Sequence, residues 1–201
     1  MVVATDPSAV PASDVVVVAT KTTANARLGE LVAGAGVPGA TIAVFQNGLG
    51  AEGVAADLRR ARVEAAVLGD LGVARWRKLV WNIPFNGLCS LLDASTDGLL
   101  ADPATRALVA DLMDEVVAGA RAAGHDVPEA FRDEMLAATD AMRPYDPSMK
   151  LDLAAGRPLE IDAIYDVAAR TAREAGVPMP RTEALAAMLR FRDRPVPLQP
   201  T

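Results

Sequence analysis

The sequence changes character within residues 63–86, VEAAVLGDLGVARWRKLVWNIPFN. Its first six residues are apolar except for Glu64, and we predict a short β-strand there. From residue 73 onward, apolar side chains recur every three or four positions, which is the spacing of an α-helix. We therefore predict a chain of two parts, with an α/β arrangement before this stretch and an all-α arrangement after it.

Before residue 70, β-branched segments alternate with helix-like segments, which is typical of βαβ units around a parallel sheet. The predicted strands are residues 15–19, 41–46 and 63–68, with helices at 22–32 and 52–61 and a turn at 34–39. The later predicted helices are residues 73–93, 103–123, 128–142, 158–174 and 181–192. This gives a first domain at 1–70, a helical domain at 71–193 and a flexible tail at 194–201.

Composition excludes several classes of protein. Hydrophobic residues make up 51% of the 201 residues, which is enough for a sizeable core. The net charge of -6 disfavours nucleic acid as a partner. One cysteine and one histidine, Cys89 and His125, leave no set of ligands for a Cys- or His-rich metal site, and we expect no metal. No apolar run is long enough to span a membrane and no signal pattern follows Met1, so we expect a cytoplasmic protein.

Two stretches match the G-x-G-x-x-G pattern of dinucleotide-binding loops. Gly34, Gly36 and Gly39 follow a predicted helix, which is the wrong order for phosphate binding. The second match, at residues 48–53, follows a predicted strand and precedes a helix, with Asp70 near the spacing of a ribose-binding acid. A tight strand-to-helix turn explains this match equally well, so both interpretations stay open.

A polar stripe is predicted on the helix at residues 73–93, since Lys78, Asn82, Asn86 and Ser90 recur every four residues. A solvated helix face would explain it. However, Asn is a poor interior helix residue, and Pro84 removes one backbone hydrogen bond within the same segment. One ammonium and two amides also suit a 2-keto acid, because amides can hold its oxygens while the ammonium protonates the carbonyl oxygen as hydride arrives.

A second candidate segment runs from Ser148 to Glu160. Ser148 follows a turn and is predicted to cap a helix, while Glu160 falls in the first turn of the predicted helix at 158–174. Both residues have this structural explanation. The functional alternative is that the hydroxyl holds a carboxylate and the Glu accepts hydrogen bonds from sugar hydroxyls.

Four segments in this order resemble the ketopantoate reductase family: VVVVATKT at 15–22, FQNGLG at 45–50, WRKLVWNIPFNG at 76–87 and SMKLDLAAGRPLEID at 148–162. The resemblance implies a partial Rossmann-like parallel sheet followed by a helical C-terminal domain. It implies reduction of 2-dehydropantoate to pantoate by NADPH, for pantothenate synthesis. It also implies the following roles: Lys78 as the general acid, Asn82, Asn86, Ser148 and Asn47 as substrate contacts, and Lys21, Asn47 and Glu160 as NADPH contacts.

The sequence also departs from the family pattern. Family members have a strand and a glycine-rich phosphate loop before the counterpart of Asp14, and further sheet structure before the Trp-x-x-Lys helix, so we expect an incomplete nucleotide-binding half. Thr96 stands where some members have a third asparagine. An exposed sheet edge and the helical domain both favour a homodimer. Two alternatives stay open: a catalytically silent, self-associating helical module, and a reductase of another 2-keto acid.

Overall fold

The computed structural model describes residues 13–18, 36–44 and 71–194. Two strands come first, β1 (Ser13–Val18) and β2 (Gly36–Val44), and they pair in parallel. The helical elements that follow are α3 (Leu71–Leu92), α4 (Thr96–Ala101), α5 (Pro103–Ala122), α6 (Phe131–Asp140), α7 (Ser148–Ala154), the π-helical turn η3 (Asp162–Asp166), α8 (Val167–Glu174) and α9 (Pro180–Arg192). The helices predicted at 22–32 and 52–61, the strand predicted at 63–68 and residues 195–201 of the predicted tail lie outside the described residues.

The two strands correct one prediction. The turn predicted at residues 34–39 is wrong from Gly36 onward, because β2 already begins there. Val15 to Val18 pair in register with Thr41 to Val44, but between Ser13 and Val15 the register shifts. Across that shift β1 advances by two residues (13 to 15) and β2 by five (36 to 41), so the extra residues bulge out of a continuous strand pair.

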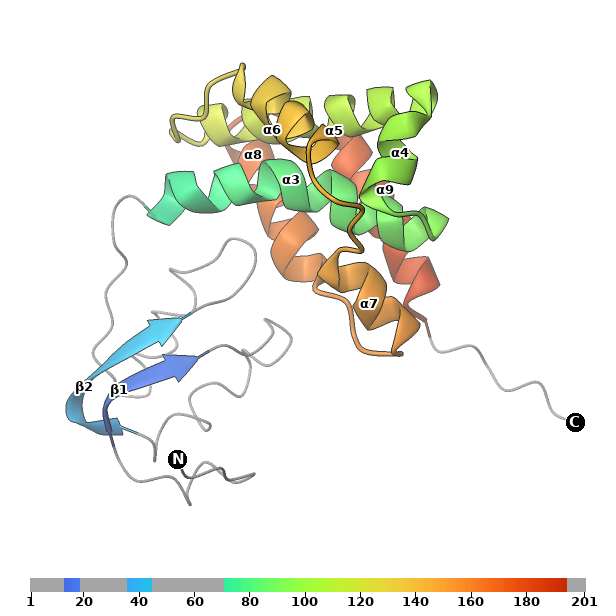
Figure 1. The fold of residues 1–201 in the computed structure, drawn as a ribbon. Coiled ribbons are helices and arrows are strands. Elements are labelled where there is room, and N and C mark those ends of the chain that lie inside the picture. Colours follow the sequence, from blue (N-terminus) through green and yellow to red (C-terminus); the bar gives the residue numbers. More distant parts are fainter. Residues whose placement is uncertain (1–12, 19–35, 45–70, 195–201) are drawn as a thin grey trace, which may run out of the picture.

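Helix α3 lies at the centre of the helical part. It packs against α5, α7 and α9, and in Figure 1 it crosses the bundle with α5 and α6 above it and α7 below it. Every residue from Asn82 to Ser90 is buried, whereas the first turns near Leu71 are partly exposed. A helix that is buried on all sides must be enclosed by its neighbours, so the second half of α3 forms the core around which the other helices pack.

Most long helices begin and end where the sequence predicts. Asp102 caps α5 by accepting hydrogen bonds from the backbone N–H groups of Ala104 and Thr105, both at 2.9 Å, and Pro103 occupies the first helical position. Gly124 and Gly176 follow the ends of α5 and α8 with φ of 83° and 87°, a conformation that favours glycine. These caps explain why α5 lies within one residue of its predicted bounds and why α8 ends at Glu174, the predicted end of the helix at 158–174.

Other bounds need correction. The predicted helix at 128–142 begins only at Phe131, after a turn closed by Phe131 N–H and the Pro128 carbonyl. The predicted helix at 158–174 begins near Asp162, and as a π-helical turn. Neither of the short helices α4 and α7 is among the predicted helix ranges, because six or seven residues carry too little periodicity to separate a helix from a loop. The predicted cap at Ser148 did indicate a helix start where α7 begins.

The start of α9 is capped from another helix. Met179, the residue before α9, provides no side-chain cap. Instead Glu115 of α5 accepts hydrogen bonds from the backbone N–H groups of Arg181 and Thr182, both at 2.9 Å, and from the Thr182 hydroxyl at 3.0 Å. Only 9% of the Glu115 side chain is exposed, so this carboxylate is a largely desolvated link between α5 and α9.

We expect Glu115→Ala to lower the free energy of unfolding by about 2 kcal/mol, because two helix-terminal N–H groups lose a charged acceptor. Asp111→Ala is the matched control. Asp111 also lies on α5 and pairs with Arg181 at 3.1 Å, but both side chains are half exposed, so its loss costs about 0.5 kcal/mol or less. Urea unfolding monitored by circular dichroism compares the two variants, and equal losses would contradict the capping role of Glu115.

Candidate active site

The predicted polar stripe is present on α3, but only its first member faces solvent. Lys78 is exposed, while Asn82, Asn86 and Ser90 are 6%, 2% and 1% exposed. A solvated face therefore explains Lys78 and is wrong for the other three. Buried amides and hydroxyls are costly unless they are hydrogen-bonded, so each of the three needs a partner.

Asn86 finds its partners on α7. Its side-chain oxygen accepts a hydrogen bond from the Met149 backbone N–H at 3.1 Å and a weaker one from the Ser148 hydroxyl at 3.5 Å. Ser90 donates its hydroxyl to the Asn86 backbone carbonyl at 2.6 Å. The side-chain oxygen of Asn86 already accepts hydrogen bonds from α7, so the NH₂ group is the part of this amide that remains for a ligand. Toward a ligand, Asn86 therefore acts only as a hydrogen-bond donor.

Asn82 differs from Asn86, one helical turn away. Its side chain is almost fully buried, yet no described residue donates a hydrogen bond to its carboxamide or accepts one from it. A buried polar group without a partner costs about 1–3 kcal/mol. Such a group points to a ligand that completes its hydrogen bonds, and Asn82 lies between exposed Lys78 and the donor end of Asn86 on the same stripe.

Ser148 and Glu160 both follow the stripe in the chain. Ser148 is exposed and is the first residue of α7, not its cap, because Pro147 occupies the capping position. Its hydroxyl contacts Asn86, so the structure brings these two predicted residues together. Glu160 is 5% exposed and precedes η3, so it does not lie in the first turn of a helix as predicted. Predicted contacts Lys21 and Asn47, with the second glycine loop, lie outside the described residues.

Other reactive side chains of the helical part are unsuited to the chemistry. Lys150 is tied into ion pairs with Asp146 at 2.9 Å and Asp93 at 3.4 Å, and the Asp146 hydrogen bond raises the pKa of Lys150 further above its usual value. Burial raises the pKa of the Cys89 thiol to about 12, so this cysteine stays protonated and unreactive.

Within the described residues, no group of three His, Cys, Asp or Glu side chains could hold a metal ion. No described helix is long and apolar enough to cross a membrane.

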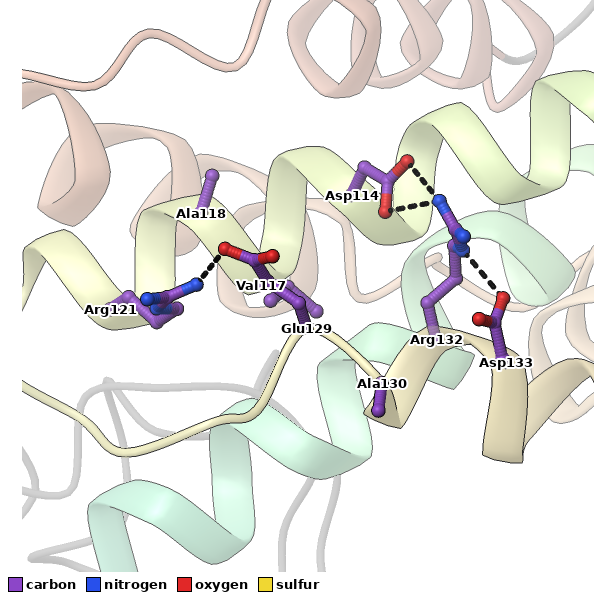
Figure 2. A pocket seen from close by; sticks show the side chains of 8 residues that line it. All are labelled: Asp114, Val117, Ala118, Arg121, Glu129, Ala130, Arg132 and Asp133. Carbon is purple, nitrogen blue, oxygen red and sulfur yellow. Dashed lines mark hydrogen bonds and ion pairs between the residues drawn. The ribbon is translucent and has the colours of Figure 1, made fainter.

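A groove of about 720 Å³ lies elsewhere, between α5 and the start of α6. Figure 2 shows that its charged side chains pair with one another: Arg121 with Glu129, and Arg132 with Asp114 and Asp133. None of the predicted site residues lines it. Its charges are therefore already satisfied, and the groove does not compete with the α3 stripe as a catalytic site.

Comparison with known protein families covers both parts of the chain. Residues 70–193 match the family model described as ketopantoate reductase PanE/ApbA C terminal, and residues 1–74 match ketopantoate reductase PanE/ApbA. The chain belongs to the ketopantoate reductase family. The matched segments include every site residue predicted from the sequence, although the assignment of a role to each residue stays a prediction.

Individual relatives carry the same family name. The 2-dehydropantoate 2-reductase of Nostoc sp. is 46% identical to this chain over 137 residues, which make up 68% of the chain. The chain spans 43% of the length of that relative, and less than half the length of three others with its name. The crystal structure of 2-dehydropantoate 2-reductase from Geobacter metallireducens superimposes with a TM-score of 0.81 at 35% identity, covering 92% of this chain and 79% of that one. A dimeric ketopantoate reductase from Staphylococcus aureus shares the fold, with a TM-score of 0.76 at 19% identity over 90% of this chain and 77% of that one.

Opposite effects on stability are expected for two matched substitutions in the stripe. Asn82→Leu removes a buried amide that has no partner within residues 13–18, 36–44 and 71–194, and we expect it to raise the free energy of unfolding by about 1 kcal/mol. Asn86→Leu leaves the buried Met149 N–H without an acceptor, and we expect it to lower the free energy of unfolding by about 2 kcal/mol. Thermal and urea unfolding of both variants without ligand test this; a loss of stability in Asn82→Leu as large as in Asn86→Leu would contradict the assignment of Asn82 as a ligand-binding group.

Proposed function

We propose that this chain carries the substrate site of a 2-dehydropantoate 2-reductase, which reduces the ketone of 2-dehydropantoate to the alcohol of pantoate with NADPH. The observation that carries the proposal is the buried carboxamide of Asn82, which has no partner among the described residues and lies on one stripe with Lys78 and Asn86. The names of the relatives support the choice of substrate. A 2-keto acid offers a carboxylate and an adjacent carbonyl, which are acceptors for such donors.

The proposed substrate contacts have roles that follow from their positions: Asn82 and Asn86 on the stripe, and Ser148 beside it. Asn86 donates through its NH₂ end, because α7 occupies its oxygen. Neither end of the Asn82 amide has a partner in the part of the chain that the structure describes, so the amide can donate to the substrate carboxylate or carbonyl oxygen and accept from a substrate hydroxyl. Ser148, exposed beside Asn86, adds a hydroxyl at the same end of the stripe.

Lys78 is the proposed general acid. Its ammonium lies one helical turn before Asn82, at the exposed end of the stripe, where it can protonate the carbonyl oxygen as that oxygen gains negative charge. The other lysine near the stripe, Lys150, is held between two carboxylates and is less suited to reach a substrate. A cation at position 78 would also attract the anionic substrate to the site.

The described residues fit one portion of a nicotinamide cofactor. Glu160 places a carboxylate at only 5% exposure two residues before η3, and carboxylates accept hydrogen bonds from ribose hydroxyls. We propose NADPH as the cofactor, with Glu160, Lys21 and Asn47 as its contacts. When bound, it would supply the hydride for the carbonyl carbon.

The same proposal covers the domain organisation. Residues 1–70 form the partial Rossmann-like, dinucleotide-binding domain, of which β1 and β2 are two parallel strands, and residues 71–193 form the helical domain. We propose that the helical domain also provides the surface of a homodimer, since a ketopantoate reductase of the same fold is dimeric. A reducing, cytoplasmic location suits a single buried thiol.

Replacement of Lys78 tests the chemistry directly. We expect Lys78→Met to lower kcat for 2-dehydropantoate by a factor of about 10² to 10⁴, the usual contribution of a general acid. Arg77→Met is the matched control, because Arg77 is the adjacent exposed cation on α3 and lies 5.1 Å from the Phe131 ring, away from the stripe. Oxidation of NADPH, followed by absorbance at saturating substrate, measures both; equal kcat values in the two variants would exclude Lys78 as the acid.

The alternatives give different results with the unmodified chain. Saturable enhancement of NADPH fluorescence together with turnover of 2-dehydropantoate supports the reductase. If cofactor binds but another 2-keto acid in a small panel reacts faster, the mechanism stands and the substrate changes. Absence of NADPH binding at millimolar concentration would instead favour the catalytically silent, self-associating helical module.

A further inference from the structure

Tyr165 reaches α3 from a distant part of the chain. Its side chain is fully buried, and its hydroxyl donates a hydrogen bond to the backbone carbonyl of Ile83 at 3.0 Å. Ile83 follows Asn82 directly and lies in the helical turn that separates Asn82 from Asn86. The tyrosine therefore contacts the backbone between the two amides that we propose to bind substrate.

Gly87 makes this contact possible. A Cβ atom at position 87 would lie 2.8 Å from the Tyr165 hydroxyl oxygen and 2.5 Å from Leu185 Cδ2, both closer than real side chains approach. The hydroxyl thus lies against the α3 backbone in space left by a missing side chain. In an α-helix the N–H of residue 87 bonds the carbonyl of residue 83, so the tyrosine adds a second donor at this same bond.

This turn of α3 needs support because Pro84 lies inside it. Proline has no N–H, so the carbonyl of Val80 loses its usual helical donor and the backbone ladder is interrupted beside Asn82. Two side chains supply additional donors just beyond the interruption: Tyr165 to the Ile83 carbonyl, and Ser90 to the Asn86 carbonyl. Side-chain hydrogen bonds thus reinforce the backbone at both ends of the segment from Ile83 to Asn86.

The element that carries Tyr165 is itself unusual. Tyr165 lies in η3, a π-helical turn that begins two residues after Glu160, and π-helical turns are rare and frequent at functional sites. Burial raises the pKa of Tyr165 well above its ordinary value, so the hydroxyl keeps its proton and remains a donor. The segment from Glu160 to Tyr165 thus joins a proposed cofactor contact to the backbone of the substrate stripe.

We propose that Tyr165 is a positioning residue of the reductase site, which fixes the turn of α3 from Asn82 to Asn86 against the segment that carries Glu160. Its effect on catalysis rests on the proposed function, whereas its effect on the α3 backbone does not. Loss of the Tyr165 hydroxyl would loosen the placement of the Asn82 and Asn86 amides. We therefore expect weaker substrate binding and little change in the rate of the chemical step. The contact with Gly87 makes the ring position specific to this pair of residues.

The test compares Tyr165→Phe with Thr182→Val in the full chain. Each variant loses one fully buried hydroxyl, but the Thr182 hydroxyl bonds Glu115 at the start of α9 rather than α3. We expect Tyr165→Phe to raise the KM for 2-dehydropantoate roughly three- to tenfold while kcat and the KM for NADPH change little. Hydrogen exchange of the backbone amides at residues 85–88 should become faster in Tyr165→Phe, and Thr182→Val should change neither exchange there nor either KM.

The two readouts separate this inference from the proposed function. An unmodified chain without turnover would contradict the proposed function, and the exchange measurement would then decide the role of Tyr165 in holding α3. Exchange at residues 85–88 no faster in Tyr165→Phe than in Thr182→Val overturns the inference. So does an unchanged KM for 2-dehydropantoate in a chain that turns over.

Discussion

The burial of the α3 segment from Asn82 to Ser90 on all sides is the constraint on which the rest of the structure depends. Because every residue from Asn82 to Ser90 is enclosed by other helices, each polar group in that segment must be paired or left at a cost. Asn86 is paired by the start of α7, and this bond places Ser148 beside the stripe. The same requirement makes Asn82 conspicuous, because it is as enclosed as its neighbours and has no partner among the described residues.

Stability and function therefore separate along one helix face. Asn86 has a structural role, since it holds α7 against α3. Asn82 has no partner among the described residues, so we expect its burial to cost stability when no ligand is bound, which is typical of groups prepared for a ligand. Pro84 adds a second weakness at the same turn, and the donors from Tyr165 and Ser90 offset it from outside and within the helix. The site is thus the part of the core where a helix contains a proline and a buried amide has no partner among the described residues. Tyr165, from a distant part of the chain, helps to compensate for the proline.

The sequence predicted the features that depend on local chemistry. Proline at the first turn of α5 and glycine after α5 and α8 placed those helix ends, and the four-residue spacing placed Lys78, Asn82, Asn86 and Ser90 on one face. It could not predict which part of that face is buried, because burial depends on α7 and α9, far along the chain. The cap on α9 from Glu115 and the bond from Tyr165 to Ile83 join residues 66 and 82 positions apart, and no local pattern encodes such pairs.

The most direct test of the account is whether the Asn82 amide binds a 2-keto acid. The side-chain NH₂ resonances of Asn82, assigned with the Asn82→Leu variant in ¹⁵N-labelled protein, can be followed while 2-dehydropantoate is added in the presence of NADP⁺. The account predicts a saturable shift and slower exchange with solvent for the Asn82 NH₂ group, because a ligand supplies the acceptor that the described residues lack. Unchanged Asn82 resonances at concentrations of 2-dehydropantoate that saturate turnover would contradict it.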